Sequence, residues 1–106
     1  MATTTTKVLA RTAASTTTTT VLYTVPASTT TVVTNIAVTN TAGTAGTFTI
    51  GMGPAAGQIA LHTTTAIAAN TTVYIDLKQV LATTNTITGG ASATSINFHI
   101  SGVEIA

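Results

Sequence analysis

Apolar and polar residues alternate with a period of two in three segments of this sequence, and this alternation restricts the fold more than any other feature. The three segments are 48–52, 73–78 and 96–101. Successive side chains of a β-strand point to opposite faces of a sheet, so each segment predicts a strand with one buried face. An amphipathic helix would instead repeat its apolar residues every three or four positions. The alternation therefore predicts an all-β protein.

Weaker alternation adds more strands along the chain. It occurs in five further segments, namely 7–12, 20–25, 31–39, 58–62 and 85–88. Threonine, with 30 residues, is the dominant type, and its branched Cβ packs well on a pleated sheet. Turn-forming residues such as Gly53-Pro54 and Gly89-Gly90 separate the segments. About eight short strands predict a β-sandwich, of either the jelly-roll or the immunoglobulin-like type.

The chain of 106 residues has the length of one domain. Area scaling for this size gives a folded surface of roughly 5,400 Å² against about 15,000 Å² unfolded, which is enough burial for one modest core. We therefore expect a single β-sandwich domain over residues 1–106, with a short N-terminal arm over residues 1–6.

The alternation breaks once in the last predicted strand. Gly102 follows Ile100 in phase, and the apolar positions then shift to Val103 and Ile105. A β-bulge at Ser101-Gly102 would restore the buried face, and a separate terminal strand is the alternative.

Charge and cysteine content limit the partners of the chain. Only five residues are charged and the net charge is +1, so the sequence offers no electrostatic surface for a nucleic acid or an anionic membrane. The absence of cysteine excludes disulfides and thiolate metal sites. The first residues lack the apolar segment of a signal peptide, so we expect synthesis without a secretion step.

The sequence contains few groups from which an active site could be built. His62, His99, Asp76 and Glu104 all fall in the polar phase of their predicted strands, away from a core that would perturb them. We therefore expect no catalytic residues, no cofactor-binding residues and no metal ligands. A metal site made by both histidines and one carboxylate stays open as an alternative, although no local ligand spacing supports it.

Three large side chains lie out of phase with the apolar face of their strands. Leu9 is expected to point outward between Lys7 and Arg11, and Leu22 and Tyr74 oppose the better apolar sets of their strands. Exposed apolar side chains indicate contact with another subunit. We therefore expect Leu9, Leu22 and Tyr74 to lie in an interface.

Four segments, 21–28, 31–40, 67–70 and 96–104, resemble small virion structural proteins of tailed bacteriophages, especially those of cyanobacteria. The resemblance spans most of the chain. It implies a β-sandwich, often a homotrimer, that serves as a capsid cement or decoration protein on the outer shell. The implied partner is the major capsid protein, and the implied location is the capsid surface after synthesis in the host cytoplasm.

A cement protein binds a repeating shell through strand edges and apolar contacts, without a small-molecule substrate. The resemblance implies that an N-terminal arm adds a strand to a neighbour, and the arm residues are Ala2, Thr3, Thr4, Thr5 and Thr6.

Two other classes of binding protein and one enzyme stay open. A tail-, baseplate- or fibre-associated virion protein, or a carbohydrate-binding β-sandwich, would expose aromatic residues for stacking on sugars. Phe48 and Phe98 instead fall in core phase. A small hydrolase would need convergent titratable groups, which this sequence does not supply.

Overall fold

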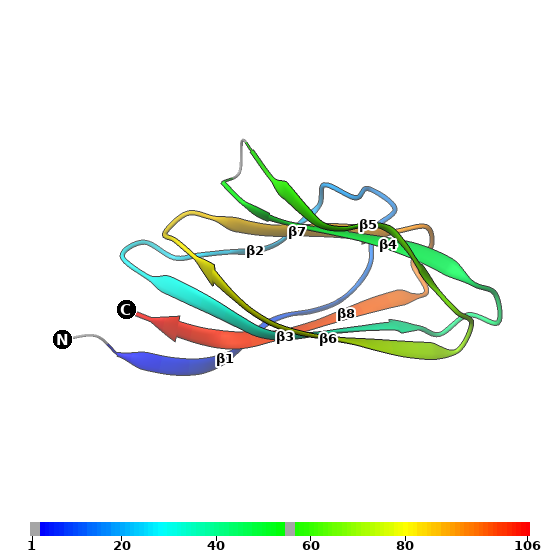
Figure 1. The fold of residues 1–106 in the computed structure, drawn as a ribbon, viewed down its shortest axis with the longest axis horizontal. Helices are drawn as coiled ribbons and strands as arrows, with labels where there is room; N and C mark the ends of the chain where they lie inside the picture. The colour runs from blue at the N-terminus through cyan, green and yellow to red at the C-terminus, as the bar shows by residue number, and fades with distance from the viewer. Residues whose placement is uncertain (1–2, 55–56) are drawn as a thin grey trace.

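The computed structural model describes residues 3–54 and 57–106, which form eight strands in two stacked antiparallel sheets (Figure 1). The strands are β1 (Thr4–Ala13), β2 (Val21–Thr24), β3 (Thr30–Asn40), β4 (Gly46–Gly53), β5 (Ile59–Ile67), β6 (Thr71–Leu81), β7 (Thr86–Ala91) and β8 (Ile96–Ile105). No helix in these two ranges is long and apolar enough to cross a membrane. The prediction of an all-β sandwich with eight strands is confirmed.

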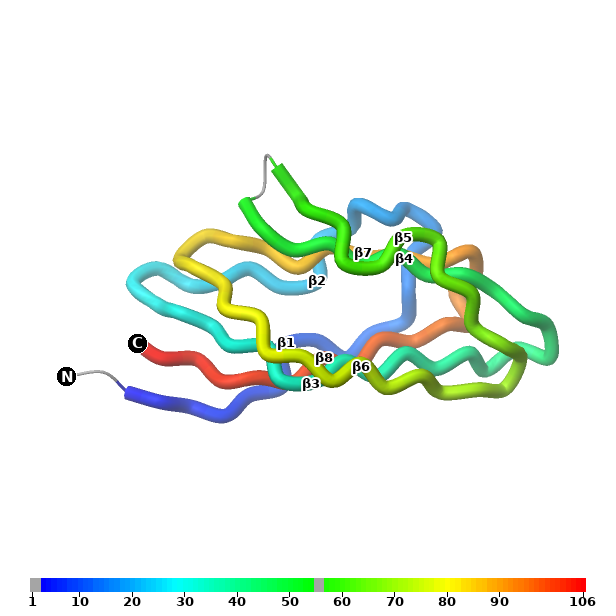
Figure 2. The backbone as a smooth tube through the Cα atoms, in the orientation of Figure 1, coloured from blue at the N-terminus to red at the C-terminus, as the bar shows by residue number. Residues whose placement is uncertain are grey.

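The strand order identifies the sandwich as a jelly roll. One sheet has the order β1-β8-β3-β6 and the other β2-β7-β4-β5. The first strand pairs with the last, the second with the seventh, the third with the sixth and the fourth with the fifth, as in one long hairpin rolled onto itself (Figure 2). In an immunoglobulin sheet the first strand lies beside the second. Of the two predicted sandwich types, the structure has the jelly roll.

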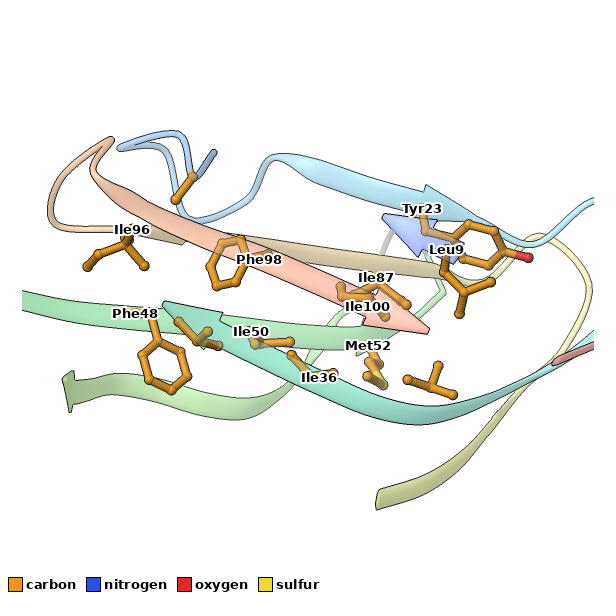
Figure 3. Close-up of a cluster of buried hydrophobic side chains, with 14 of the residues drawn as sticks. Leu9, Tyr23, Ile36, Phe48, Ile50, Met52, Ile87, Ile96, Phe98 and Ile100 are labelled. Carbon is orange, nitrogen blue, oxygen red and sulfur yellow. The ribbon is translucent and has the colours of Figure 1, made fainter. Parts of the chain in front are cut away.

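The core lies between the two sheets and is built from the in-phase apolar residues. Phe48 and Ile50 of β4 face Phe98 and Ile100 of β8, and each of the four is at most 1% exposed (Figure 3). The accessible surface is 5450 Å², close to the value expected for a folded chain of this length.

The predicted bulge in the last strand is wrong, because the irregularity lies in the two neighbouring strands. β8 runs without a break through Ser101 and Gly102, while β1 carries Leu9 and β3 carries Thr34 as an extra residue at the same level. Gly102 stays in the inward phase and is buried. A Cβ atom there would lie 2.8 Å from Cδ1 of Leu9, so the leucine fills the space that the glycine leaves.

Gly89 and Gly90 do not form the predicted turn, because both lie inside β7 and are buried. The connection between β1 and β2 passes directly over Gly90, and β4 lies close to Gly89. A Cβ atom on Gly90 would lie 2.6 Å from the carbonyl oxygen of Thr17, and one on Gly89 would lie 2.9 Å from that of Thr49. These glycines are therefore positions of close backbone approach within a strand.

The expected N-terminal arm is not separate from the domain over residues 4–6. Thr4, Thr5 and Thr6 belong to β1 and pair with β8. The N–H of Ala106 also donates to the carbonyl oxygen of Thr3 over 2.9 Å, so the described ends of the chain lie side by side (Figure 1). Ala2 lies outside the described residues.

Candidate interaction surfaces

The structure keeps three of the four titratable residues singled out in the sequence apart from one another. His62 is turned toward Phe48, with ring centroids 5.5 Å apart, and its Nδ1 lies 3.3 Å from Oγ1 of Thr65. His99 is exposed on β8, and Asp76 accepts a hydrogen bond of 3.4 Å from the amide of Asn35. Within residues 3–54 and 57–106, no three His, Asp or Glu side chains are close enough to hold a metal ion.

Glu104 does not lie on a solvated strand face, as the sequence predicted, but joins the two sheets. It has the inward phase of Ile100 and Gly102, and its side chain is 14% exposed. The hydroxyl of Tyr23, on β2 of the other sheet, donates a short hydrogen bond to Glu104 Oε2. Nζ of Lys7 lies 3.3 Å from Oε1 of the same carboxylate, and Oγ1 of Thr31 lies 2.9 Å from the tyrosine hydroxyl.

This cluster has a defined charge state. The hydrogen bond from Tyr23 is the main cause that lowers the pKa of Glu104 below its ordinary value of 4.5, and Lys7 adds to it. Burial, together with the neighbouring carboxylate, raises the pKa of Tyr23 to about 12. The carboxylate is therefore ionised and the phenol protonated at neutral pH. The cluster ties β2 to β8, and its polar atoms are engaged with one another.

The five charged residues all belong to one sheet. Lys7 and Arg11 lie on β1, Asp76 and Lys78 on β6, and Glu104 on β8, which are three of the four strands of the sheet β1-β8-β3-β6. The strands of the other sheet contain no Asp, Glu, Lys or Arg. The two sides of the sandwich therefore differ in the partners that they can attract.

The solvent-facing side of the charged sheet is formed by residues that line up in rows across its four strands. We call this surface the outer face. Its three central rows, each read from β1 through β8 and β3 to β6, are Arg11, His99, Ala37 and Tyr74; Val8, Ser101, Asn35 and Asp76; and Thr6, Val103, Val32 and Val80. Tyr74 is 70% exposed and Val80 is 69% exposed, so large apolar groups on this face have no cover within the chain.

In the other sheet, the outward side of β7 is covered by the chain itself, whereas Val21 of β2 and Ile59 of β5 are 55% and 71% exposed. Thr86 and Thr88 of β7 are 4% and 7% exposed, because the side chain of Gln58 lies over them. Nε2 of Gln58 donates to Oγ1 of Thr86 over 2.6 Å, and Thr88 donates to Oε1 of Gln58 over 3.0 Å. Farther along β7, the connection between β1 and β2 covers Gly90.

Among the described residues β1 presents a free strand edge, since β8 is its one partner there. Thr3 and Ala106 form a hydrogen-bonded pair, so the alternation of an antiparallel ladder places the next bonded pairs at Thr5 and Lys7. The backbone N–H and C=O groups of Thr4, Thr6 and Val8 therefore point away from β8. This edge carries the hydrogen-bonding groups that an added strand would need.

The predicted interface residues have different fates in the structure. Leu9 was expected to point outward and does not: it is 7% exposed and belongs to the core, because the bulge in β1 turns it inward. Leu22 is half-buried against the core, and its place in an interface stays a prediction. Tyr74 is exposed, as expected, and Thr3 to Thr6 are exposed along β1.

Sequence reasoning missed the apolar part of the outer face, made by Val8, Val32, Val80 and Val103. The run Gln79-Val80-Leu81 ends β6, where the register against β3 shifts between Val33 and Asn35. Within β6 the alternation is unbroken: Val80 continues the outward side of Tyr74 and Asp76, and Leu81 continues the core-facing side. The alternation of the segment 73–78, continued to positions 80 and 81, was the local signal that placed Val80 outward and Leu81 inward.

The surface of the described residues includes two open hollows. One, of about 340 Å³, runs between the edges of β1 and β2 and is lined by Arg11 and Leu22 among others. The other, of about 470 Å³, lies beside Thr34, Asp76 and Lys78. Each contains at most one acidic side chain and no histidine, so neither gathers the groups that acid–base catalysis requires.

No protein-family model and no curated protein sequence matches this chain. Among solved structures, a chain in the structure of infectious bursal disease virus, strain Gx, aligns with a TM-score of 0.61 and 13% identity, over 98% of this chain and 32% of that one. A chain in the structure of the T13 particle of the same virus gives a TM-score of 0.57 and 10% identity, over 98% and 30%. The coat protein of tobacco streak virus gives a TM-score of 0.42 at 13% identity, over 99% and 84%.

The chain spans about a third of the length of the two bursal-disease-virus chains. At 13% and 10% identity, the likeness establishes a shared fold over nearly the whole of this chain. The fold is thus one that also occurs within proteins of virus particles.

Proposed function

We propose that this chain is a structural protein of a virus particle, which attaches to the outside of the shell and reinforces it by bridging neighbouring coat subunits. The observation that carries the proposal is the jelly roll, which aligns over 98% of the chain with part of a protein in a virus particle. The resemblance of four sequence segments to phage virion proteins points in the same direction and specifies a cement or decoration role on a phage head.

We propose that the free edge of β1 is one attachment point. Thr4, Thr6 and Val8 direct their backbone groups outward, and the stretch from Thr4 to Thr6 has neither charge nor bulge to prevent another strand from pairing. A coat-protein strand could extend the sheet by main-chain hydrogen bonds. A shell offers many equivalent sites, so a weak contact at each copy adds up to reinforcement of the whole particle.

The location is tested by electron cryomicroscopy of particles of the virus whose genome encodes this chain. The proposal predicts density for a small β-sandwich on the outer shell, between coat subunits. Density at the tail, baseplate or fibre would replace the cement role by the alternative virion role. Particles that lack the protein altogether would overturn the proposal.

The attachment edge is tested with two proline variants added to shells assembled without the protein. Thr6→Pro removes an N–H that points to the free edge, and proline is tolerated in edge strands at such positions. Thr5→Pro is the matched control, because it removes an N–H that bonds to β8. We expect Thr6→Pro to fold and to bind shells more weakly, and Thr5→Pro to destabilise the isolated domain. Unchanged shell binding by folded Thr6→Pro would exclude the edge as the attachment point, whatever the location of the protein.

A further inference from the structure

We infer that the outer face binds the same face of a second copy of this chain, forming a two-fold dimer. This inference does not rest on the proposed function, since it concerns the purified protein alone. Its basis is the arrangement of the residues across the rows of the outer face, which is complementary to itself.

A two-fold axis parallel to the mean strand direction relates the two copies. Such an axis places β1 of one copy over β6 of the other, and β8 over β3, with each row facing its own copy. Every residue on β1 or β8 is then opposite the residue of the same row on the partner's β6 or β3.

The row that begins at Arg11 shows the complementarity most clearly. Arg11 faces the partner's Tyr74, whose ring is 70% exposed and is available for a cation–π contact. His99 faces the partner's Ala37, so a large side chain meets a small one. The symmetry repeats both contacts on the other side of the axis.

The charges and the apolar residues follow the same symmetry. Asp76 lies two residues from Tyr74 on β6, roughly 7 Å along the strand, so Arg11 can also reach the partner's Asp76. In the next rows Val103 faces the partner's Val32, and Ser101 faces the partner's Asn35. Val8 is the residue directly opposite the partner's Asp76, and Lys78, exposed on the same side of β6, gives that edge a charge of each sign. Apolar and hydrogen-bonding pairs lie between the two edges.

The size of the face is adequate for a dimer. Four strands spaced about 4.8 Å apart and ten residues long, at about 3.3 Å each, cover roughly 600 Å². A standard interface buries about 800 Å² on each partner, so the face reaches the lower part of that range. The opposite sheet is a poorer choice, because Gln58 and the connection between β1 and β2 already cover its centre.

Sedimentation velocity and light scattering over a concentration series of the purified chain test the inference. We expect a particle of twice 10.5 kDa that dissociates on dilution. Arg11→Asp and Asp76→Arg should each raise the dissociation constant at least tenfold, by opposing like charges across the axis. The double variant exchanges the charges and should regain most of the affinity, which loss of folding or general surface effects would not reproduce.

A matched pair of lysine substitutions identifies the face. Val32→Lys places a charge at the centre of the outer face, whereas Val21→Lys changes a valine that is 55% exposed on β2 of the other sheet. We expect only Val32→Lys to abolish the dimer, with circular dichroism reporting the fold of both. A trimer, a monomer at all concentrations up to about 1 mM, or a dimer broken by Val21→Lys and not by Val32→Lys would overturn the inference. None of these results bears on where the protein lies in a particle.

Discussion

Leu9 and Gly102 share one position of the core. The two residues lie on the paired strands β1 and β8, and a Cβ atom on Gly102 would lie 2.8 Å from Cδ1 of Leu9. It would also clash with the carbonyl oxygen of Val32 on β3. Because of the bulge in β1, the side chain of Leu9 fills the space beside Gly102, where β8 has no side chain.

Gly102→Ala is expected to destabilise the fold by about 1–3 kcal/mol, the usual cost of overpacking a filled core. Because one of the two obstacles is backbone, rotation of the leucine cannot relieve the clash. Gly43→Ala is the control, since a Cβ atom there would meet nothing within 4 Å. Urea unfolding of both variants checks the expectation, and equal midpoints would contradict it.

Glu104 makes the stability of the domain sensitive to acid. Its pKa is lowered in the folded state by the hydrogen bond from Tyr23, so the unfolded chain takes up a proton first as the pH falls. The ionised carboxylate of Glu104 therefore makes its full contribution to the free energy of unfolding above about pH 4.5, and this contribution is lost below that pH. Glu104→Gln should flatten this part of the stability profile, measured by urea unfolding between pH 2 and 7, roughly the span over which carboxylates titrate. If the stability of Glu104→Gln fell with acid as steeply as that of the parent protein, the carboxylate of Glu104 would not be the source of the acid sensitivity.

Tyr23 gives the opposite dependence at alkaline pH. Its pKa is raised to about 12 in the fold, against 10.0 for an unperturbed tyrosine. Stability should be constant below pH 10 and fall as the pH rises from 10.0 toward about 12. Tyr23→Phe should remove this fall, and at neutral pH it should cost about 1.5–3 kcal/mol for the lost bond to a charged group. Thermal melts at pH 7 measure the stability lost with the hydrogen bond, and melts at pH 11 measure the loss caused by ionisation of Tyr23.

Asn40 holds two connections together at the end of β3. It is 2% exposed, and its Nδ2 donates to the carbonyl oxygens of Thr44 and Ala68 over 2.9 and 3.3 Å. Its Oδ1 accepts a bond of 3.0 Å from the N–H of Ala42. Asn40→Ala should cost about 2–4 kcal/mol, because these backbone groups lose their partner. Asn35→Ala, on the outer face, should cost less than about 1 kcal/mol in the same chemical unfolding assay.

Thr84 is a β-branched residue with a left-handed backbone, at φ 70°. This conformation is unfavourable for threonine and is tolerated by asparagine. Thr84→Asn should therefore raise the unfolding free energy by about 0.5–1 kcal/mol. Thr83→Asn is the control: Oγ1 of Thr83 donates to the carbonyl oxygen of Thr29 over 2.8 Å, so its loss should lower the stability. A melting temperature unchanged by Thr84→Asn would show that the turn carries no strain.

Local alternation was enough to predict the strands, because it depends only on neighbouring residues. Phe48 and Ile50, or Phe98 and Ile100, share a face whatever the rest of the chain does. Leu9 was assigned to the wrong face because one extra residue in a strand exchanges its two faces. That extra residue is accommodated by a glycine on the last strand, which no local pattern connects to Leu9.

Glu104 and the rows of the outer face were beyond sequence reasoning for the same reason. A carboxylate in a strand is ordinarily solvated, and only Tyr23, from the other sheet, makes its inward position favourable. Tyr74 could be recognised as exposed from its own strand. Its alignment with Ala37, His99 and Arg11 depends on the register of four strands that are scattered along the chain.

The pairing of β1 with β8 also determines when the domain can fold during its synthesis. β1 leaves the ribosome before the other seven described strands, and β8, its partner in the sheet, emerges after them. β3 likewise lacks one of its neighbours until the 10 residues of β8 have emerged. A nascent chain from which β8 has not yet emerged therefore has open strand edges, and pairing must wait until β8 is exposed, on the slow timescale of proteins rich in non-local contacts. A truncation within β8 would leave the chain in that aggregation-prone state permanently.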